Sequence, residues 1–204
     1  MRWLAFAFLL LLSSSADANN NTSSDLVAAA RAQVGVTLIY DSSYRRIAYP
    51  MGDVPLDRGV CSDVVVRAFR AIGIDLQEQV HRDMARHFAA YPKVWGLSAP
   101  DANIDHRRVP NLATWLARQG YALPVSDDPT TFLPGDVVTW DLGNGRPHIG
   151  IVSDRRSGDG VRPLVIHNIG RGAREEDTLF EYRITAHFRA FQALSAPSLL
   201  PGTG

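Results

Sequence analysis

The only cysteine of the chain, Cys61, lies where a thiol could act as a nucleophile. Apolar residues follow it at steps of three and four, which predicts an amphipathic helix from Ser62 to Ile72 that ends at Gly73. A thiol in the first turn lies among unpaired N–H groups at the positive end of the helix dipole, and both favour the thiolate. The same N–H groups could bind a developing oxyanion. The alternative is a small buried side chain, the usual role of a lone cysteine.

Two histidines later in the chain could supply a base for that thiol. Alternating residues predict strands from His148 to Ser153 and from Pro163 to Asn168. If these strands form a symmetric hairpin, His148 and His167 become direct cross-strand neighbours with Cβ atoms about 5 Å apart. His148 would then take the thiol proton, and His167 would bond to its far nitrogen and fix its tautomer. Gly150 would leave room for the cysteine helix. The alternative is a pair of histidines that satisfy buried hydrogen bonds.

Helices come first along the chain and strands come later. Further helices are predicted from Asp25 to Val34 with Ser24 as its cap, from Leu76 to Tyr91, and from Val109 to a stop at Gly120. Further strands are predicted over Val137 to Asp141, Leu179 to Ile184 and His187 to Phe191. This order predicts an α+β fold in which an antiparallel sheet packs on the helices.

The first residues have the pattern of a secretory signal peptide, residues 1–18. Arg2 is followed by an apolar run, Trp3 to Leu12, that is too short to span a bilayer, and Ala16-Asp17-Ala18 matches a cleavage site. An uncleaved anchor is the alternative. We expect the mature chain to be secreted across the inner membrane into the periplasm or beyond, without stable membrane insertion. A secreted chain with one cysteine has either a reactive thiol or an intermolecular bridge.

Composition fits one globular domain. The chain has 204 residues, 46% of them hydrophobic, and a formal net charge of zero. Such a chain can bury a core, and its neutral balance gives no indication of nucleic-acid binding. We expect the domain to span residues 19–194 and the tail, residues 195–204, to be disordered.

Several motifs resemble those of NlpC-like cell-wall peptidases in the papain superfamily. They are a cysteine that opens a helix, then Pro134-Gly135-Asp136-Val137-Val138-Thr139-Trp140, His148-Ile149-Gly150-Ile151-Val152 and Val165-Ile166-His167-Asn168. The residues of these motifs, together with Gly59-Val60-Cys61 and His167-Asn168-Ile169-Gly170, resemble an uncharacterised bacterial family, domain of unknown function 1287. This resemblance extends from Leu26 to Phe188.

The resemblance implies a papain-like fold, no cofactor and a Cys-His-His triad of Cys61, His148 and His167. It also implies that a tyrosine upstream of the cysteine, here Tyr40, assists the oxyanion site. The chain departs from the NlpC-like pattern because Val60 precedes the cysteine and Ser62-Asp63 follows it, where Asp and Ser-Gly are usual.

Other polar residues are candidates for substrate binding. Asp63, Asn168, His106 and Arg107 join Tyr40 as oxyanion or substrate candidates, and arginines such as Arg107, Arg108, Arg146, Arg171 and Arg174 could bind substrate carboxylates at a cleft rim. The alternatives are a solvated face for the arginines and a surface ion pair between Asp63 and Arg67. His81 and His87 are six residues apart on different helix faces, so we expect no metal site.

These residues predict a secreted cysteine hydrolase, and the resemblance to NlpC-like peptidases implies an amidase or endopeptidase that cleaves an amide bond in peptidoglycan stem peptides. Cys61 would attack the carbonyl carbon, and His148 would act first as base and then as acid. The expected partner is peptidoglycan or another peptide substrate; the sequence identifies no protein inhibitor. Two alternatives remain open: a papain-like acyltransferase or lipid-directed thiol hydrolase, and a non-catalytic cell-wall binding module.

Overall fold

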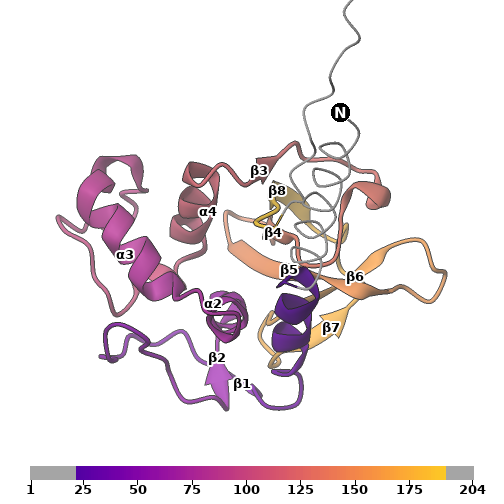
Figure 1. Ribbon diagram of the computed structural model, residues 1–204, viewed down its shortest axis with the longest axis horizontal. Helices are drawn as coiled ribbons and strands as arrows, with labels where there is room; N and C mark the ends of the chain where they lie inside the picture. Colours follow the sequence, from indigo (N-terminus) through magenta and orange to yellow (C-terminus); the bar gives the residue numbers. More distant parts are fainter. Residues whose placement is uncertain (1–21, 192–204) are drawn as a thin grey trace, which may run out of the picture.

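The protein places its helices on one side of an antiparallel sheet (Figure 1). The computed structural model describes residues 22–191, so the predicted signal peptide (1–18) and the predicted disordered tail (195–204) lie outside the described residues. The α+β class predicted from the order of elements is confirmed. Within residues 22–191, no helix has the length and apolar character needed to cross a membrane.

The helices form close to their predicted positions, and their ends differ for local reasons. Residues 22–31 are helical, and they are followed by α2 (Cys61–Ala71), α3 (Leu76–His87) and α4 (Val109–Arg118). Ser24 lies inside the first of these helices, so its predicted capping role is wrong. α3 is shorter than predicted because its last turn tightens into a 3-10 helix, Phe88–Ala90, before Pro92.

The main sheet has six strands in the order β3-β8-β4-β5-β6-β7, and all neighbours are antiparallel. Their bounds are β3 Ala122–Leu123, β4 Val137–Asp141, β5 Pro147–Arg156, β6 Pro163–His167, β7 Arg174–Glu176 and β8 Arg183–Phe188. The two strands predicted between Leu179 and Phe191 are in fact one. Leu179 is fully buried in a turn, where its carbonyl accepts a hydrogen bond from Trp140 Nε1.

A separate parallel pair, β1 (Ile39–Tyr40) and β2 (Arg58–Gly59), leads into α2. Tyr40 pairs with Gly59, so it lies beside the backbone two residues before the cysteine. The pair lies below α2 in the view of Figure 1. It therefore brings the segment around Tyr40 to the start of the cysteine helix.

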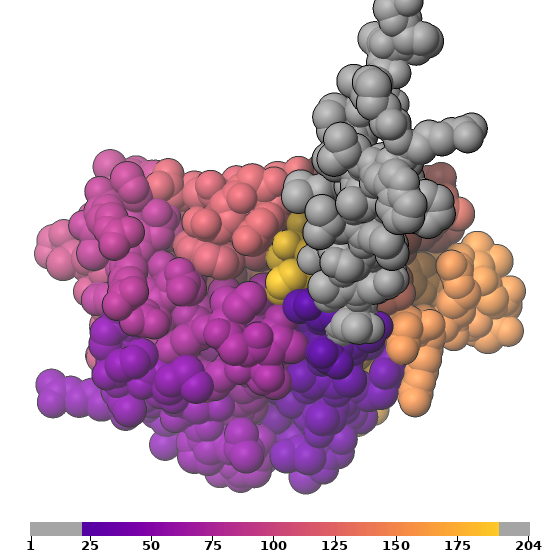
Figure 2. Space-filling model, viewed as in Figure 1, coloured from indigo at the N-terminus to yellow at the C-terminus, as the bar shows by residue number. Residues whose placement is uncertain are grey.

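Both faces of the main sheet are covered. One apolar cluster joins the helices to the sheet and includes Cys61, Phe69, Ile149, Ile151 and Ile166. A smaller cluster on the other face contains Phe132, Val138, Trp140, Val152, Val165 and Leu179. The β5–β6 hairpin, orange in Figure 2, projects from the side away from α3 and α4. The central strands are thus packed on both faces. The candidate site involves β5, β6 and β7 together with the start of α2.

Candidate active site

Cys61 is the first residue of α2, and two neighbouring residues shape the backbone there. Val60 is the N-cap but offers no side-chain cap; instead, Asp63 Oδ2 accepts a hydrogen bond from Val60 N–H at 2.6 Å. Gly59 has φ +156°, and a Cβ at this position would lie 2.9 Å from Asp63 Oδ2. Gly59 therefore leaves room for the Asp63 carboxylate, and together these two residues fix the conformation of the backbone that leads into Cys61.

Asp63 and Arg107 form a buried ion pair beneath this first turn. Arg107 Nε and Nη2 donate to the Asp63 carboxylate at 2.8 and 3.0 Å, and both side chains are only 3% exposed. Arg107 also donates to the carbonyls of Asp41 and Ser43. The prediction of a surface pair between Asp63 and Arg67 is wrong, since Arg67 bonds to Asp53 instead. Through these contacts Asp63 and Arg107 hold the backbone around the start of α2.

His148 and His167 are hydrogen-bonded, but in a different register from the predicted one. Ile151 pairs with Ile166 and Val152 with Val165, which is a shift of two residues from the symmetric hairpin. An even shift keeps both histidines on one face and makes them diagonal neighbours. Nε2 of His148 lies 2.8 Å from Nδ1 of His167, and both rings are buried.

Gly150 makes this diagonal contact possible. A Cβ on Gly150 would lie 3.1 Å from His167 Cβ and 2.8 Å from a methyl group of Val165. Without a side chain at Gly150, the His167 ring can lean across β5 toward His148. The prediction that Gly150 makes room for the cysteine helix is therefore wrong, because the space that it leaves is occupied by β6.

The sequence analysis missed Glu176, a third member of this chain of contacts. Glu176 Oε2 lies 3.2 Å from Nε2 of His167. It comes from β7, which pairs with β6 so that Glu176 is opposite Val165. In the sequence, the three residues of β7 lie within a charged run that resembles a surface turn, so Glu176 was not predicted as a site residue. Arg174 and Glu176 alternate onto the histidine face, but three residues are too few for alternation to be recognised in the sequence.

Burial keeps both the thiol and its candidate base neutral. Burial raises the pKa of Cys61 to about 11, and the nearby N–H groups of Ile149, Ser62 and Cys61 only partly oppose this. Burial and the neighbouring His167 lower the pKa of His148 to about 3. The expected thiolate is thus corrected to a thiol, because desolvation outweighs the helix terminus.

The thiol lies close to β5 without a hydrogen bond to a histidine. The Ile149 N–H that influences Cys61 belongs to the residue next to His148. Within residues 22–191, no hydrogen bond joins the Cys61 Sγ to either imidazole, and none reaches Nδ1 of His148. That nitrogen is therefore free to accept a proton.

A hollow of about 460 Å³ opens beside His148, here called the sheet-side hollow. It is lined by Tyr40, Leu142, Gly145, Arg146, Pro147, His148, Asn168, Ile169 and Gly170. Burial and, to a smaller extent, the charge of a Cys61 thiolate raise the pKa of Tyr40. Tyr40 thus shares this hollow with His148 and pairs with Gly59, and its role at an oxyanion site stays a prediction.

Asn168, another predicted substrate residue, is used to hold the backbone. Its Nδ2 donates to the Gly59 carbonyl at 3.1 Å, and its Oδ1 accepts from Gly170 N–H at 3.1 Å. The side chain is fully buried. Asn168 therefore ties the end of β6, next to His167, to the residues that precede Cys61.

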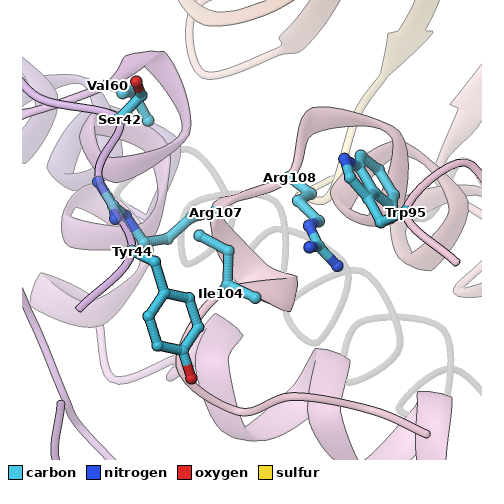
Figure 3. Close-up of a pocket in the computed structure, with 7 residues that line it drawn as sticks. All are labelled: Ser42, Tyr44, Val60, Trp95, Ile104, Arg107 and Arg108. Carbon is cyan, nitrogen blue, oxygen red and sulfur yellow. The ribbon is translucent and has the colours of Figure 1, made fainter. Parts of the chain in front are cut away.

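A second hollow of about 340 Å³, the helix-side hollow, lies beside Val60 (Figure 3). It is lined by Ser42, Tyr44, Val60, Trp95, Ile104, Arg107 and Arg108. The Arg108 guanidinium stacks on the Trp95 ring at 4.2 Å, and Figure 3 shows Tyr44 away from this pair. Tyr40 lines one hollow, while Ser42 and Tyr44 line the other, so one extended segment borders both.

His106 takes no part in this site. It is 3% exposed and lines neither hollow, and burial followed by the neighbouring Arg107 lowers its pKa to about 4. Its prediction as a substrate residue is therefore not supported by its position. The part of the chain that the structure describes contains no group of three or more His, Cys, Asp or Glu side chains arranged to hold a metal ion.

Comparison with known proteins agrees with the family suggested by the motifs. The chain is 57% identical over 162 residues to the uncharacterized protein YijF of Escherichia coli (strain K12), an alignment that covers 79% of this chain and 78% of that protein. No solved structure matches. Residues 27–190, which include every residue of the site described above, match the model of the Domain of unknown function (DUF1287), and the chain belongs to this family.

Proposed function

We propose that this chain is a cysteine hydrolase with a papain-like, NlpC-type fold that cleaves an amide bond in peptidoglycan stem peptides. The observation that carries the proposal is the hydrogen-bonded chain from His148 through His167 to Glu176, which starts on β5, the strand that packs against the helix opened by Cys61. Nucleophile, base and orienting groups in this order are what thiol-dependent acyl transfer requires.

The reaction would begin with transfer of the Cys61 thiol proton to Nδ1 of His148 as Sγ attacks the carbonyl carbon. The carbonyl oxygen would take the negative charge and bind the N–H of Cys61 and the Tyr40 hydroxyl. The His148 imidazolium would then protonate the leaving nitrogen as the C–N bond breaks, leaving a thioester. A water molecule, deprotonated by His148, would attack the thioester and release the acid and the thiol.

The neutral resting state affects how this reaction starts. With the pKa of Cys61 near 11 and that of His148 near 3, a preformed thiolate–imidazolium pair is disfavoured in the free protein. Proton transfer would therefore accompany attack on a bound substrate. Such a thiol would react slowly with oxidants, which suits an oxidising compartment such as the periplasm.

The surroundings of the site suit an extended anionic peptide. The two hollows flank the start of α2, and each contains an arginine, Arg146 on the sheet side and Arg108 on the helix side. Arginine is well suited to carboxylates. The resemblance to NlpC-like enzymes and the signal-like first 18 residues support peptidoglycan stem peptides, which the protein would meet after secretion into the periplasm.

Digestion of purified sacculi by the mature protein tests the proposal. Cys61→Ser is the matched control, since it keeps a small nucleophilic side chain but loses the thiol. We expect the wild type to release fragments with a new amine and a new free carboxylate, identified by mass spectrometry, and the variant to release none. Equal release by both proteins would refute the thiol mechanism. Products acylated on a second molecule would indicate transfer instead of hydrolysis.

A further inference from the structure

Glu176, at the outer end of the hydrogen-bonded chain His148–His167–Glu176, has no role in the proposed reaction steps. We propose that Glu176 is a positioning residue that fixes the protons on both histidines, so that His148 presents an unprotonated Nδ1 to the thiol. This inference deepens the proposed function and rests on its assignment of His148 as the base. It follows from the hydrogen-bonding capacities of the three side chains.

The proton positions can be followed inward from Glu176. A carboxylate only accepts hydrogen bonds, so Nε2 of His167, 3.2 Å away, must carry the hydrogen. Neutral His167 then has a lone pair on Nδ1, which can only accept. Nε2 of His148, 2.8 Å from that atom, must therefore donate, which leaves Nδ1 of His148 as a lone pair.

Among residues 22–191, the surroundings of His167 offer no other group to set these protons. Of the described residues, only Glu176 forms a hydrogen bond with Nε2 of His167. Glu181 influences His167 electrostatically but does not bond to it, and Arg174 lies 4.0 Å from the far oxygen of Glu176. The Glu176 side chain is 27% exposed on the edge strand β7, so water can solvate its charge.

Reversing the protons would disable the base. If Nδ1 of His167 carried the hydrogen, Nε2 of His148 would have to accept it. The hydrogen of neutral His148 would then lie on Nδ1, and that nitrogen could not take the thiol proton. Glu176 excludes this arrangement because it cannot donate to Nε2 of His167.

The ring nitrogens can be observed directly by ¹⁵N NMR on the mature wild-type protein near pH 7. We expect Nε2 of both histidines to be protonated and Nδ1 of both to be unprotonated. A protonated Nδ1 on His148 or His167 would overturn the proposal without any variant. This readout does not depend on a substrate, so a failure of sacculus digestion would remove the proposed function and leave the role of Glu176 to be decided separately.

Three variants show whether Glu176 causes the pattern. Glu176→Leu should give a mixture of tautomers and slow alkylation of Cys61 by iodoacetamide by about 10- to 100-fold, comparable to losing the partner that orients a functional histidine. Glu176→Gln should retain much of the wild-type pattern, because the amide oxygen of glutamine can accept a hydrogen bond from Nε2 of His167. Glu181→Gln, which removes a nearby charge without a hydrogen bond, should leave tautomers and alkylation rate unchanged.

An unchanged ring-nitrogen pattern in folded Glu176→Leu would refute the proposal, as would an equal effect of Glu181→Gln. Thermal unfolding of each variant establishes that the fold is kept. If Glu176→Leu does not fold, the wild-type pattern and the comparison of Glu176→Gln with Glu181→Gln still decide the outcome.

Discussion

The sheet region contains two imidazole–carboxylate pairs with buried imidazoles, and they differ in what surrounds the second ring nitrogen. Nε2 of His187, on β8, lies 2.7 Å from Asp136, the residue before β4, and its Nδ1 is buried without a hydrogen bond. In the other pair, His167 on β6 is hydrogen-bonded to Glu176 on β7 and, through its second ring nitrogen, to His148 on β5. His148 borders the sheet-side hollow. Nδ1 of His187 is therefore shielded from solvent, whereas Nδ1 of His148 is not.

The carboxylates also differ. Asp136 accepts two hydrogen bonds from Arg189 and one from Leu133 N–H, and Phe132 stacks on His187 at 4.4 Å. The Asp136 carboxylate thus joins β8 to the loop before β4, and the remaining nitrogen of His187 is shut in without a partner. On the other side, Nδ1 of His148 has no hydrogen bond among the described residues, and His148 borders the sheet-side hollow. A histidine–carboxylate pair thus suggests catalysis only where it leads to a ring nitrogen that remains free to take a proton.

Substitution of each histidine should separate the two roles most clearly. His148→Ala should reduce hydrolysis by about 10²- to 10⁴-fold, the usual contribution of a general base. His187→Ala should leave the rate per folded molecule near that of the wild type and lower the free energy of unfolding by about 1–3 kcal/mol. Rates on the sacculus substrate and urea unfolding measure the two effects. Similar rate losses in both variants would remove the distinction.

The second prediction concerns Arg107, whose charge is structural, and Arg146, which borders the sheet-side hollow. Arg107→Ala should lower the free energy of unfolding by about 3–5 kcal/mol, because Asp63 would remain buried without a partner. Arg146→Ala should change it by less than about 0.5 kcal/mol and raise KM for an anionic peptide. Urea unfolding and substrate kinetics test this pair. A stable, catalytically impaired Arg107→Ala would contradict the structural role.

The third prediction concerns acid stability. Folded His148 has a pKa near 3, whereas an unfolded histidine titrates near 6.5, so the unfolded state binds the proton more readily below pH 6.5. Stability from this group is complete above about pH 6.5, and it should fall by up to about 1.4 kcal/mol per pH unit down to about pH 3. His148→Ala should show a shallower dependence in urea unfolding at pH 7, 6, 5 and 4. An identical dependence would contradict the buried neutral state of His148.

The last prediction concerns Asn168→Ala. Loss of the hydrogen bond to the Gly59 carbonyl should cost about 1–3 kcal/mol of stability. It should also change the alkylation rate of Cys61, because the backbone before the thiol is no longer held to β6. Urea unfolding and iodoacetamide labelling measure the two effects. A lower stability with an unchanged alkylation rate would limit Asn168 to a role in folding.

Local patterns predicted much of the fold because local forces determine it. Apolar spacing located α2 to within one residue, and β4 has the predicted bounds, Val137 to Asp141. The shared face of His148 and His167 also followed from alternation. The two-residue shift of register did not, because it depends on the packing of Gly150 against β6.

Longer-range features were harder to predict. The partner of Asp63 is 44 residues away, and helical spacing pointed to the nearer Arg67 instead. Glu176 belongs to a strand too short to give a periodic signal. The protonation of Cys61 depends on how deeply the first turn of α2 is buried, which helix position alone does not indicate.

The contact between Asn168 and Gly59 joins parts of the chain that are 109 residues apart. Contacts of such separation close late in folding, because a large loop must be ordered before they form. A chain that has folded only as far as its helices would already contain Cys61 but would lack the strands that carry His148, His167 and Glu176. The complete set of candidate residues therefore exists only when β5, β6 and β7 are in place.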